Sequence, residues 1–393
     1  MSANENKKII AVLGATGSVG TQALDVARSR GYAVDFLSAG RNVAAAEAAA
    51  RAFSPRAVAM ADESSARDLA VRLSDTDVRV LSGADGIVEG IAGSAADVVV
   101  NAILGEAGLR PTLAVIAAGK RLALANKESL VIAGDIVMRA AEEAGVDILP
   151  VDSEHSAIFQ SLRAGRPSEI RRLLLTASGG PFFGYTKEKL RTVTKEDALR
   201  HPTWNMGKKI TVDSATLMNK GFEVIEAAHL FGVSPDRIEV VVHRESILHS
   251  AVEYIDNTVI GEMSVPDMRM CVQYAVDYPE RHPSAGRPLD LFSVGTMTFA
   301  RPDTDAFPLL AFAGRAHAMG GGMGAVLNAA DEVAVGAFLD GHLPFWQIAE
   351  CVSQVFDACT EEVSADTPDL RIAADRHARE VARDFLGRAK QKG

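Results

Sequence analysis

The sequence is poor in cysteine, has no excess of positive charge and contains no long apolar run. Its three cysteines, Cys271, Cys351 and Cys359, form no C-x-x-C pair, and the odd number fits no disulfide framework. A reducing compartment is therefore the simplest interpretation. The 41 basic and 51 acidic residues give a net charge of −10. That balance argues against a general affinity for nucleic acid or anionic membranes, but it leaves room for a local basic pocket that binds a small phosphorylated ligand.

Membrane-spanning segments are not expected, because no window approaches the roughly 18 consecutive apolar residues that a span requires. The start, MSANENKKII, passes from polar residues directly into a strand pattern and has no apolar signal-peptide region. We therefore expect a cytoplasmic protein. An apolar share of 48% excludes disorder as the main state, and 393 residues suggest two or three domains.

Residues 1–150 alternate short apolar runs with helical patterns. Strands that alternate with helices predict right-handed βαβ crossovers and a parallel, doubly wound α/β sheet, which is a Rossmann-type domain. The expected strands span 7–13, 33–38, 56–60, 97–102, 121–125 and 146–151, and the first two helices span 20–30 and 43–53.

The chain changes character after residue 150. Residues 151–276 are expected to form an α+β catalytic domain in which some strands pair as an antiparallel meander. The proline-rich segment 277–308 is interpreted as a linker, and the helical patterns of 309–393 predict a C-terminal helical domain. The strand patterns of the second domain lie at 171–177, 238–242, 250–254 and 258–263.

A glycine turn joins the first expected strand to the first helix. Gly14, Gly17 and Gly20 have the spacing G-x-x-G-x-x-G rather than G-x-G-x-x-G. Glycines in this context permit a tight turn and a close approach of the backbone to a pyrophosphate at the helix N-terminus. The turn therefore predicts a dinucleotide site, and the alternative is a turn that only packs the helix on the strand.

The end of the second strand bears on the choice between NAD and NADP. The segment SAGRN (38–42) contains no carboxylate that could bind a ribose 2′-hydroxyl. Arg41 could pair with a 2′-phosphate, so we expect NADPH. The alternative is an arginine on a solvated loop.

Carboxylates form a second candidate site. Asp152 and Glu154 follow the apolar strand at 146–151, and on an extended segment residues i and i+2 point to the same side. Two carboxylates at the carboxyl end of a strand suit Mg²⁺ or Mn²⁺. An exposed acidic loop is the alternative.

A third carboxylate, Glu223, could complete that metal site. It belongs to a predicted helix over 218–231, where Asn219 and Lys220 precede it by four and three residues and share its face. Lys220 and Asn219 would then face an anionic group beside the metal. The alternative is a surface helix with an ordinary i,i+3 salt bridge.

Six longer motifs occur in one order along the chain. They are GATGSVG (14–20), LANKES (124–129), PVDSEHSAIFQ (150–160), ASGGPF (177–182), HPTWNMG (201–207) and VDSATLMNKGFE (212–223). With them the chain resembles the 1-deoxy-D-xylulose 5-phosphate reductoisomerase family, and the likeness continues through VPDMRM (265–270) and AVLNAADEVAV (325–335). The resemblance therefore covers nearly the whole chain.

The resemblance implies conversion of 1-deoxy-D-xylulose 5-phosphate to 2-C-methyl-D-erythritol 4-phosphate in the non-mevalonate isoprenoid pathway. Asp152, Glu154 and Glu223 would hold Mg²⁺ or Mn²⁺, which would act as a Lewis acid while the carbon skeleton rearranges. NADPH would then deliver hydride to the resulting aldehyde. The family also implies a homodimer.

The resemblance also assigns roles to individual residues. The catalytic residues that it implies are Lys127, Asp152, Glu154, His201 and Glu223. The substrate phosphate would be held by Ser178, Ser214, Asn219 and Lys220, and other parts of the substrate would be contacted by Lys127, Ser153, Glu154, His201, Trp204 and Glu223. The implied NADPH contacts are Thr16, Gly17, Ser18, Val19, Gly40, Arg41, Asn42, Asn126, Glu128 and Gly207.

HPTWNMG (201–207) resembles the family's mobile lid, in which Trp204 would cover the substrate and His201 would join the site on closure. From the residues alone, a tryptophan between proline and glycine fits either a closing loop that excludes water or a small satellite core.

The chain departs from the family where the usual HPQS reads HRES (243–246). We expect this segment to lie away from the metal and to alter at most a dimer contact. His243 and His249 would suggest zinc by spacing alone, whereas packed or hydrogen-bonded histidines are the alternative.

A second possible function is that of an aldehyde or semialdehyde dehydrogenase on the same cofactor fold. Such an enzyme would need a thiol nucleophile, but Cys271 lies in a helical pattern that is more typical of core. The intact acidic and phosphate-binding sets argue against a third alternative, an NADP-binding sensor.

Overall fold

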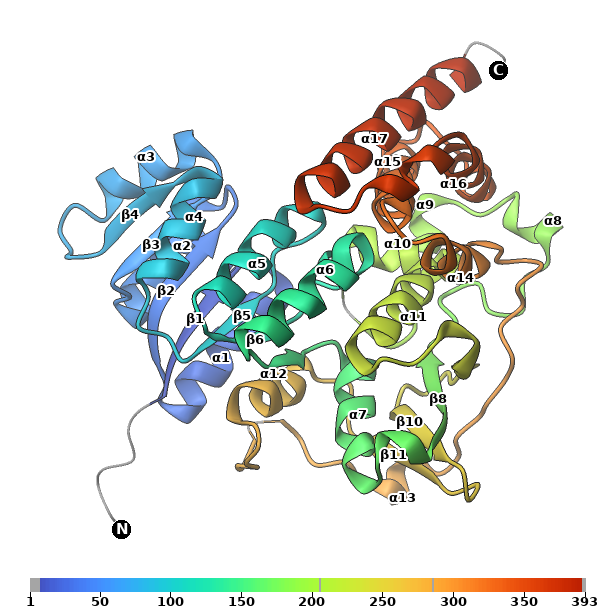
Figure 1. Ribbon diagram of the computed structural model, residues 1–393, viewed down its shortest axis with the longest axis horizontal. Coiled ribbons are helices and arrows are strands. Elements are labelled where there is room, and N and C mark those ends of the chain that lie inside the picture. The colour runs from blue at the N-terminus through green and yellow to red at the C-terminus, as the bar shows by residue number, and fades with distance from the viewer. Residues whose placement is uncertain (1–7, 205, 285, 391–393) are drawn as a thin grey trace. The chain divides into compact units, whose positions relative to one another are not determined.

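The computed structural model describes residues 8–204, 206–284 and 286–390, and the chain forms two compact units (Figure 1). The first unit comprises the chain as far as Asn126, Val137–Ser156 and Asp267–Arg287. The second comprises Lys127–Ile136, Ala157–Pro266 and the chain from Pro288 onward. Residue 7 of the expected first strand and the outermost residues of the expected 1–150 and 309–393 domains lie outside the described residues.

The first unit is built on a seven-stranded parallel sheet with the order β4-β3-β2-β1-β5-β6-β7. Its strands are β1 (Ile9–Leu13), β2 (Ala33–Ala39), β3 (Ala57–Met60), β4 (Arg79–Ser82), β5 (Val98–Asn101), β6 (Arg121–Leu124) and β7 (Ile148–Pro150). The strand order reverses between β1 and β5, so this is the doubly wound fold that the alternating pattern predicts, and ligands bind such sheets at the carboxyl ends beside the reversal.

Helices cross between these strands. They are α1 (Ser18–Arg30), α2 (Val43–Phe53), α3 (Glu63–Arg72), α4 (Gly83–Gly93) and α5 (Leu109–Ala117). The central strands β1 and β5 are apolar along nearly their whole length and almost fully buried. Such continuous burial is typical of parallel strands in sheets that are covered on both faces.

Helix α12 (Met268–Asp277) also belongs to the first unit, although the sequence placed it in the 151–276 domain. It packs against α1, and the buried carboxylate of Asp277 accepts a hydrogen bond from Tyr32 and pairs with Arg30 and Lys8. Apolar periodicity alone could not reveal this placement, because it shows which face of a helix is buried but not what covers it.

The second unit contains a four-stranded sheet with the order β11-β10-β8-β9. Its strands are β8 (Ile170–Ala177), β9 (Ile238–Val242), β10 (Leu248–Tyr254) and β11 (Val259–Met263). The β8–β10 and β10–β11 pairs are antiparallel, as the expected meander requires, but β8 and β9 pair in parallel. A parallel pair needs a long crossover, and the helices between β8 and β9 supply one.

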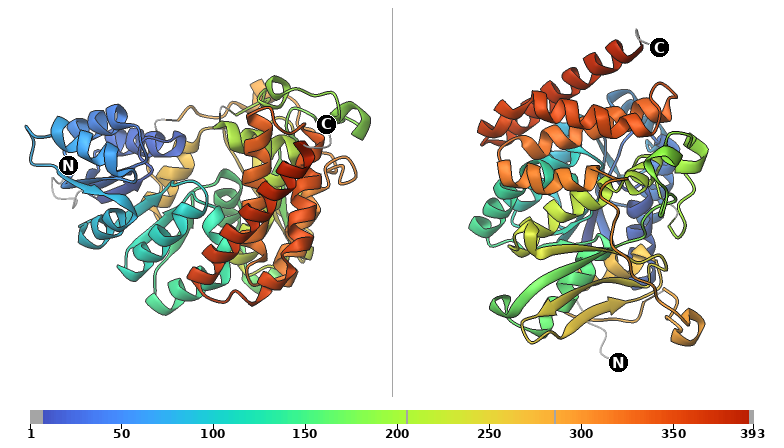
Figure 2. Two further views of the ribbon diagram at one scale, coloured as in Figure 1. Left: turned by 90° about the horizontal axis from the view of Figure 1, so that it is seen from above. Right: turned by 90° about the vertical axis from the view of Figure 1, so that its right-hand side faces the viewer.

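Helices make up most of the rest of the second unit. They are α8 (Lys187–Leu190), α9 (Lys195–Ala198), α10 (Lys208–Thr216), α11 (Met218–Phe231), α13 (Leu291–Val294), α14 (Leu309–Met319), α15 (Met323–Leu339), α16 (Trp346–Ala358) and α17 (Pro368–Lys390). Figure 2 shows α15, α16 and α17 packed side by side. Most of α15 is buried, which places it in the core of this unit.

The expected catalytic domain (151–276) and the expected C-terminal domain (309–393) contribute to one hydrophobic core. From the sequence we had interpreted the segment between them, 277–308, as a linker. Phe307 of that segment is itself a buried member of the core. Two helices, α6 (Glu128–Ala144) and α7 (Ser153–Ser161), contribute residues to both units. Within the described ranges, no helix is both long and apolar enough to span a bilayer.

Candidate active site

The glycine turn lies between β1 and α1, at the carboxyl end of the central strand. Gly14 adopts a left-handed φ of 76°, and a Cβ there would lie 2.5 Å from the carbonyl oxygen of Ala102. A Cβ at Gly20 would lie 2.1 Å from the carbonyl oxygen of Gly14. Both positions therefore require glycine, and the backbone forms the close turn before a helix N-terminus that suits a pyrophosphate.

Most of the other residues expected to bind a dinucleotide also belong to the first unit. Thr16, Gly17, Ser18 and Val19 form the turn and the start of α1, with Gly17 as its N-cap. The side chain of Asn126 donates a hydrogen bond to the carbonyl oxygen of Gly105. The expected contacts Glu128 and Gly207 belong to the second unit.

Arg41 lies on the loop after β2, next to Gly40 and Asn42. Its side chain is 86% exposed, and its Nε is 3.5 Å from Asp62 Oδ1. Hydrogen bonds from Ser64 and Ser65 lower the pKa of Asp62 to about 2, so this partner is ionised at neutral pH. Asn42 uses its side-chain oxygen to cap α2. The guanidinium is therefore exposed on the loop at the carboxyl end of β2, beside one carboxylate.

Asp152, Ser153 and Glu154 follow β7 in the first unit. The expectation of an extended segment here is wrong, because α7 begins at Ser153 and the amide of Ser156 already donates to the carbonyl oxygen of Asp152. Asp152 precedes the helix and accepts a hydrogen bond from the amide of Ser153, while the Ser153 hydroxyl donates to Glu154 at 2.5 Å. The two carboxylates thus occupy a helix start, where negative charge is favoured.

Four of the expected residues form a group in the second unit that we call the ammonium–carboxylate cluster. Its members are Lys127, Asn219, Lys220 and Glu223. Glu223 is 1% exposed; its Oε1 accepts from Lys127 at 3.2 Å and from Asn219, and its Oε2 accepts from Lys220. Lys127 also donates to Asn219 Oδ1 at 3.0 Å. The shared face of α11 is therefore confirmed, and the cluster joins two lysine side chains and one amide to a single buried carboxyl group.

Three more expected residues meet in the same unit, and we call them the hydroxyl–imidazole cluster. His201 Nε2 is 2.9 Å from Ser178 Oγ and 3.1 Å from Ser214 Oγ. Its Nδ1 accepts hydrogen bonds from the amides of Thr203 and Trp204. Because an amide can only donate, Nδ1 carries no proton, so the neutral ring carries its proton on Nε2 and donates it to a serine hydroxyl.

The motif expected to form a lid includes Asn205, which lies outside the described residues. Its Trp204 is half-buried, with its ring centroid 6.1 Å from that of His249. Gly207 is the N-cap of α10, which carries Ser214. His243, whose spacing with His249 suggested zinc, is buried and bonded to the backbone of its neighbours, which supports the hydrogen-bonded alternative.

The sequence did not indicate two features of this unit. Arg244, from the HRES segment, donates to the backbone on either side of the turn that follows Ser178. The expectation for this segment concerned its distance from the metal, and the contacts of Arg244 with the Ser178 turn do not test it. No sequence signal could have paired these residues, because 66 positions separate Arg244 from Ser178.

The second missed feature is a buried charge network. Lys209 Nζ is buried and lies 2.7 Å from Asp213 Oδ2 and 2.8 Å from Asp331 Oδ2, which ties α10 to α15. Burial and the carboxylate of Asp331 raise the pKa of Asp213, and burial raises the pKa of Glu128 against the opposing effect of Lys209. The network fixes the helix that carries Ser214.

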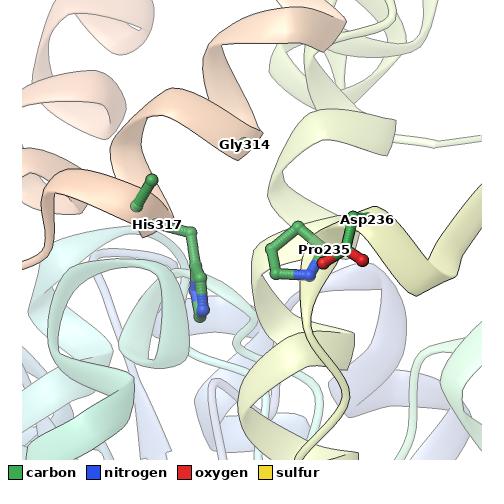
Figure 3. Close-up of a pocket in the computed structure, with 5 residues that line it drawn as sticks. Pro235, Asp236, Gly314 and His317 are labelled. Carbon is green, nitrogen blue, oxygen red and sulfur yellow. The ribbon is translucent and has the colours of Figure 1, made fainter.

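A pocket elsewhere in the second unit contains none of the expected site residues. Figure 3 shows His317 of α14 opposite Pro235 and Asp236, and Gly314 and Ala318 complete the lining. The pocket lining contains no lysine or serine side chain, unlike the two clusters, so we do not assign the pocket to the candidate site.

The first unit has a Rossmann-type sheet with a glycine turn. The second unit brings together lysines, serine hydroxyls and a buried carboxylate. This combination is typical of nucleotide-dependent oxidoreductases. Comparison with known families is more specific. The model of 1-deoxy-D-xylulose 5-phosphate reductoisomerase matches residues 10–134, and models of the C-terminal domains of that enzyme match 148–231 and 263–381. The chain belongs to the 1-deoxy-D-xylulose 5-phosphate reductoisomerase family.

Individual relatives agree over almost the full length. The reductoisomerase of Symbiobacterium thermophilum is 50% identical over 386 residues, which cover 96% of this chain and 98% of the relative. A solved reductoisomerase from Zymomonas mobilis in complex with NADPH is 40% identical, with a TM-score of 0.90, over 97% of this chain and 99% of that one. Another, in complex with NADPH, fosmidomycin and magnesium, is 37% identical, with a TM-score of 0.92, over 98% and 99%.

Proposed function

We propose that the protein converts 1-deoxy-D-xylulose 5-phosphate to 2-C-methyl-D-erythritol 4-phosphate, using NADPH and a divalent cation, Mg²⁺ or Mn²⁺, in the non-mevalonate isoprenoid pathway. The observation that carries this proposal is the near-full-length match to reductoisomerases. The two polar clusters of the second unit support it, because their members are the residues that the family motifs bring to substrate binding.

NADPH would bind to the first unit. The cradle at Gly14 and Gly20 fits a pyrophosphate because a side chain at either position would collide with backbone. The exposed guanidinium of Arg41 would pair with the 2′-phosphate. We retain the rest of the expected contact set, and the bound nicotinamide would supply the hydride.

The divalent cation would be held by Asp152, Glu154 and Glu223. Their oxygen donors fit the proposed ion, because Mg²⁺ and Mn²⁺ prefer carboxylate ligands. The hydrogen bonds to Glu223 fix its side chain, and the Ser153 hydroxyl orients Glu154. When bound, the cation would polarise the substrate's oxygen atoms as a Lewis acid.

The substrate phosphate would bind to Ser178, Ser214, Asn219 and Lys220. Two hydroxyls, an amide and a buried ammonium suit a dianion that accepts several charge-assisted hydrogen bonds. His201 Nε2 lies within hydrogen-bond distance of both serine hydroxyls and would orient the one to which it donates. We further propose that Lys127, Ser153 and His201 contact the substrate's oxygenated carbons and that Trp204 excludes water above them.

We also propose that the protein acts as a homodimer in the cytoplasm. Strand β11 is at the edge of its sheet, and its residues Val259 and Met263 are exposed apolar side chains, as is Phe292 of α13 at 98%. An exposed apolar edge strand is a ready pairing surface, and a second copy of the chain is the occupant implied by the family. Sedimentation analysis would report the number of copies.

The test of the proposed activity is steady-state oxidation of NADPH with 1-deoxy-D-xylulose 5-phosphate. We expect turnover with Mg²⁺ or Mn²⁺, formation of 2-C-methyl-D-erythritol 4-phosphate, and loss of turnover when the metal is chelated. NADPH oxidation without that product, or turnover indifferent to chelation, would contradict the proposal.

A further inference from the structure

Ser178 lies on a sharp turn whose shape is unusual for any residue but glycine. Gly179 and Gly180 follow it with left-handed φ values of 73° and 63°. The amide of Gly180 donates to Ser178 Oγ at 3.2 Å, and a Cβ at Gly180 would lie 2.7 Å from the carbonyl oxygen of Ser214. The turn therefore packs directly against α10 and sets how far the two serine hydroxyls lie from each other.

The guanidinium of Arg244 closes this turn from outside. Its Nη1 donates to the carbonyl oxygens of Ser178, at 3.0 Å, and Gly180, at 2.6 Å. Its Cζ lies 5.3 Å from the centroid of the Phe183 ring. One side chain thus donates hydrogen bonds to the carbonyl groups of both Ser178 and Gly180, which flank the turn.

The backbone that carries Arg244 is itself held firmly. The amide of His243 donates to the carbonyl oxygen of Ala177 at 2.7 Å. The His243 ring accepts at Nε2 from the amides of Ile247 and Leu248, so its proton is on Nδ1, facing the carbonyl oxygen of Thr298. Arg244 therefore projects from a fixed base, which reduces the entropy lost when it holds the turn.

The charge of Arg244 is not cancelled by a salt bridge. Its hydrogen bonds go to neutral carbonyl groups, and within the described ranges no carboxylate pairs with the guanidinium. By contrast, the neighbouring Glu245 is engaged with the amide and hydroxyl of Thr298. A positive charge thus lies beside the Ser178 turn.

We propose that Arg244 is a positioning residue for substrate binding: it holds the Ser178 turn in the shape that binds the phosphate group and adds a positive charge beside that group. This inference rests on the proposed function, because it takes Ser178 and Ser214 as phosphate ligands. It assigns Arg244 no part in proton or hydride transfer, so it affects binding of the substrate rather than the chemical step.

The experiment compares the full-length protein with Arg244→Gln, Arg244→Lys and Arg301→Gln. Arg301 is 92% exposed in the same unit, so its replacement changes net charge equally without touching the turn. For Arg244→Gln we expect KM for 1-deoxy-D-xylulose 5-phosphate to rise about tenfold while kcat stays within about twofold and KM for NADPH is unchanged. Arg244→Lys keeps the charge but loses the planar fork, so an intermediate KM is expected.

A second readout separates this inference from the proposed activity. Inorganic phosphate binding, measured by calorimetry without turnover, should weaken about tenfold in Arg244→Gln and remain unchanged in Arg301→Gln. The inference is overturned if Arg244→Gln keeps the wild-type KM and phosphate affinity, or if it lowers kcat alone. If Arg244→Gln does not fold, Arg244→Lys decides by the same two measurements. Arg244-dependent phosphate binding without turnover of the sugar phosphate would uphold the inference and contradict the proposed function.

Discussion

At the scale of single residues, hydrogen-bond geometry fixes the protonation of the group most closely tied to the serines. Two amide donors at Nδ1 leave His201 with its proton on Nε2, where both serine hydroxyls lie. A neutral ring in this tautomer can donate to a hydroxyl oxygen, which leaves that hydroxyl's own proton available for the proposed phosphate ligand. The single Nε2 proton can thus orient one serine hydroxyl as a donor before any ligand arrives.

Arg41 provides a prediction at this scale, because its proposed partner exists in NADPH and not in NADH. Arg41→Gln should weaken NADPH binding by about 10- to 100-fold, the range expected for loss of charge-assisted hydrogen bonds, and leave NADH binding nearly unchanged. Fluorescence titration of both nucleotides measures this. Arg67→Gln is the matched control, since Arg67 is 74% exposed on α3. Equal weakening of both nucleotides would contradict the assignment of Arg41.

Local spacing predicted the local geometry of some candidate residues correctly and that of others wrongly. Asn219, Lys220 and Glu223 were correctly placed on one face because helical geometry fixes neighbours three and four residues apart. The extended geometry expected for Asp152 and Glu154 was wrong, because α7 starts at Ser153, one residue after Asp152. The apolar pattern of the sequence does not locate the start of a helix to within one residue. Arg244 could not be found, because only the folded chain brings it to Ser178.

At the scale of elements, burial explains which strands could be predicted from the sequence. The buried strands β1 and β5 form continuous apolar runs and were expected close to their observed bounds. Strand β4 was missed: it is an edge strand of four residues, of which only Leu81 is buried. The parallel pairing of β8 with β9 was likewise beyond sequence patterns, because pairing partners depend on the crossover and not on the strands themselves.

The contact between helices α11 and α14 gives a pH-dependent prediction. Burial, together with the nearby His317 and Arg371, lowers the pKa of His229 to about 4 from an ordinary value near 6.5. Because the pKa of His229 is lower in the folded state than in the unfolded state, folding favours the neutral ring. The contribution of His229 to the free energy of unfolding is therefore complete above about pH 6.5 and is lost as the pH falls towards 4. At pH 5 this residue alone should cost about 2 kcal/mol relative to pH 7.5.

His229→Gln should therefore lose about 2 kcal/mol less stability than the wild type between pH 7.5 and pH 5. Urea unfolding at both values measures this difference. His342→Gln, which replaces an exposed histidine of the same unit, should behave as the wild type does. An identical pH response in His229→Gln and wild type would show that His229 is not held neutral by its surroundings.

At the scale of the whole molecule, the chain returns to units that it has already left. The first unit takes α12 from far along the sequence, and the second takes the first part of α6. A division into consecutive segments could therefore not reproduce the units. The seven-stranded sheet was nevertheless predictable as a class, since alternating strands and helices permit few topologies.

The central proposal combines these scales: three carboxylates would hold the cation on which turnover depends. Its most direct measurement is Mg²⁺-dependent turnover of 1-deoxy-D-xylulose 5-phosphate by Glu154→Gln beside the wild type, with NADPH binding measured on both and Glu143→Gln, an exposed residue of α6, as the control. We predict a loss of turnover of at least about a hundredfold with unchanged NADPH affinity. Near-normal turnover in Glu154→Gln would contradict the metal assignment.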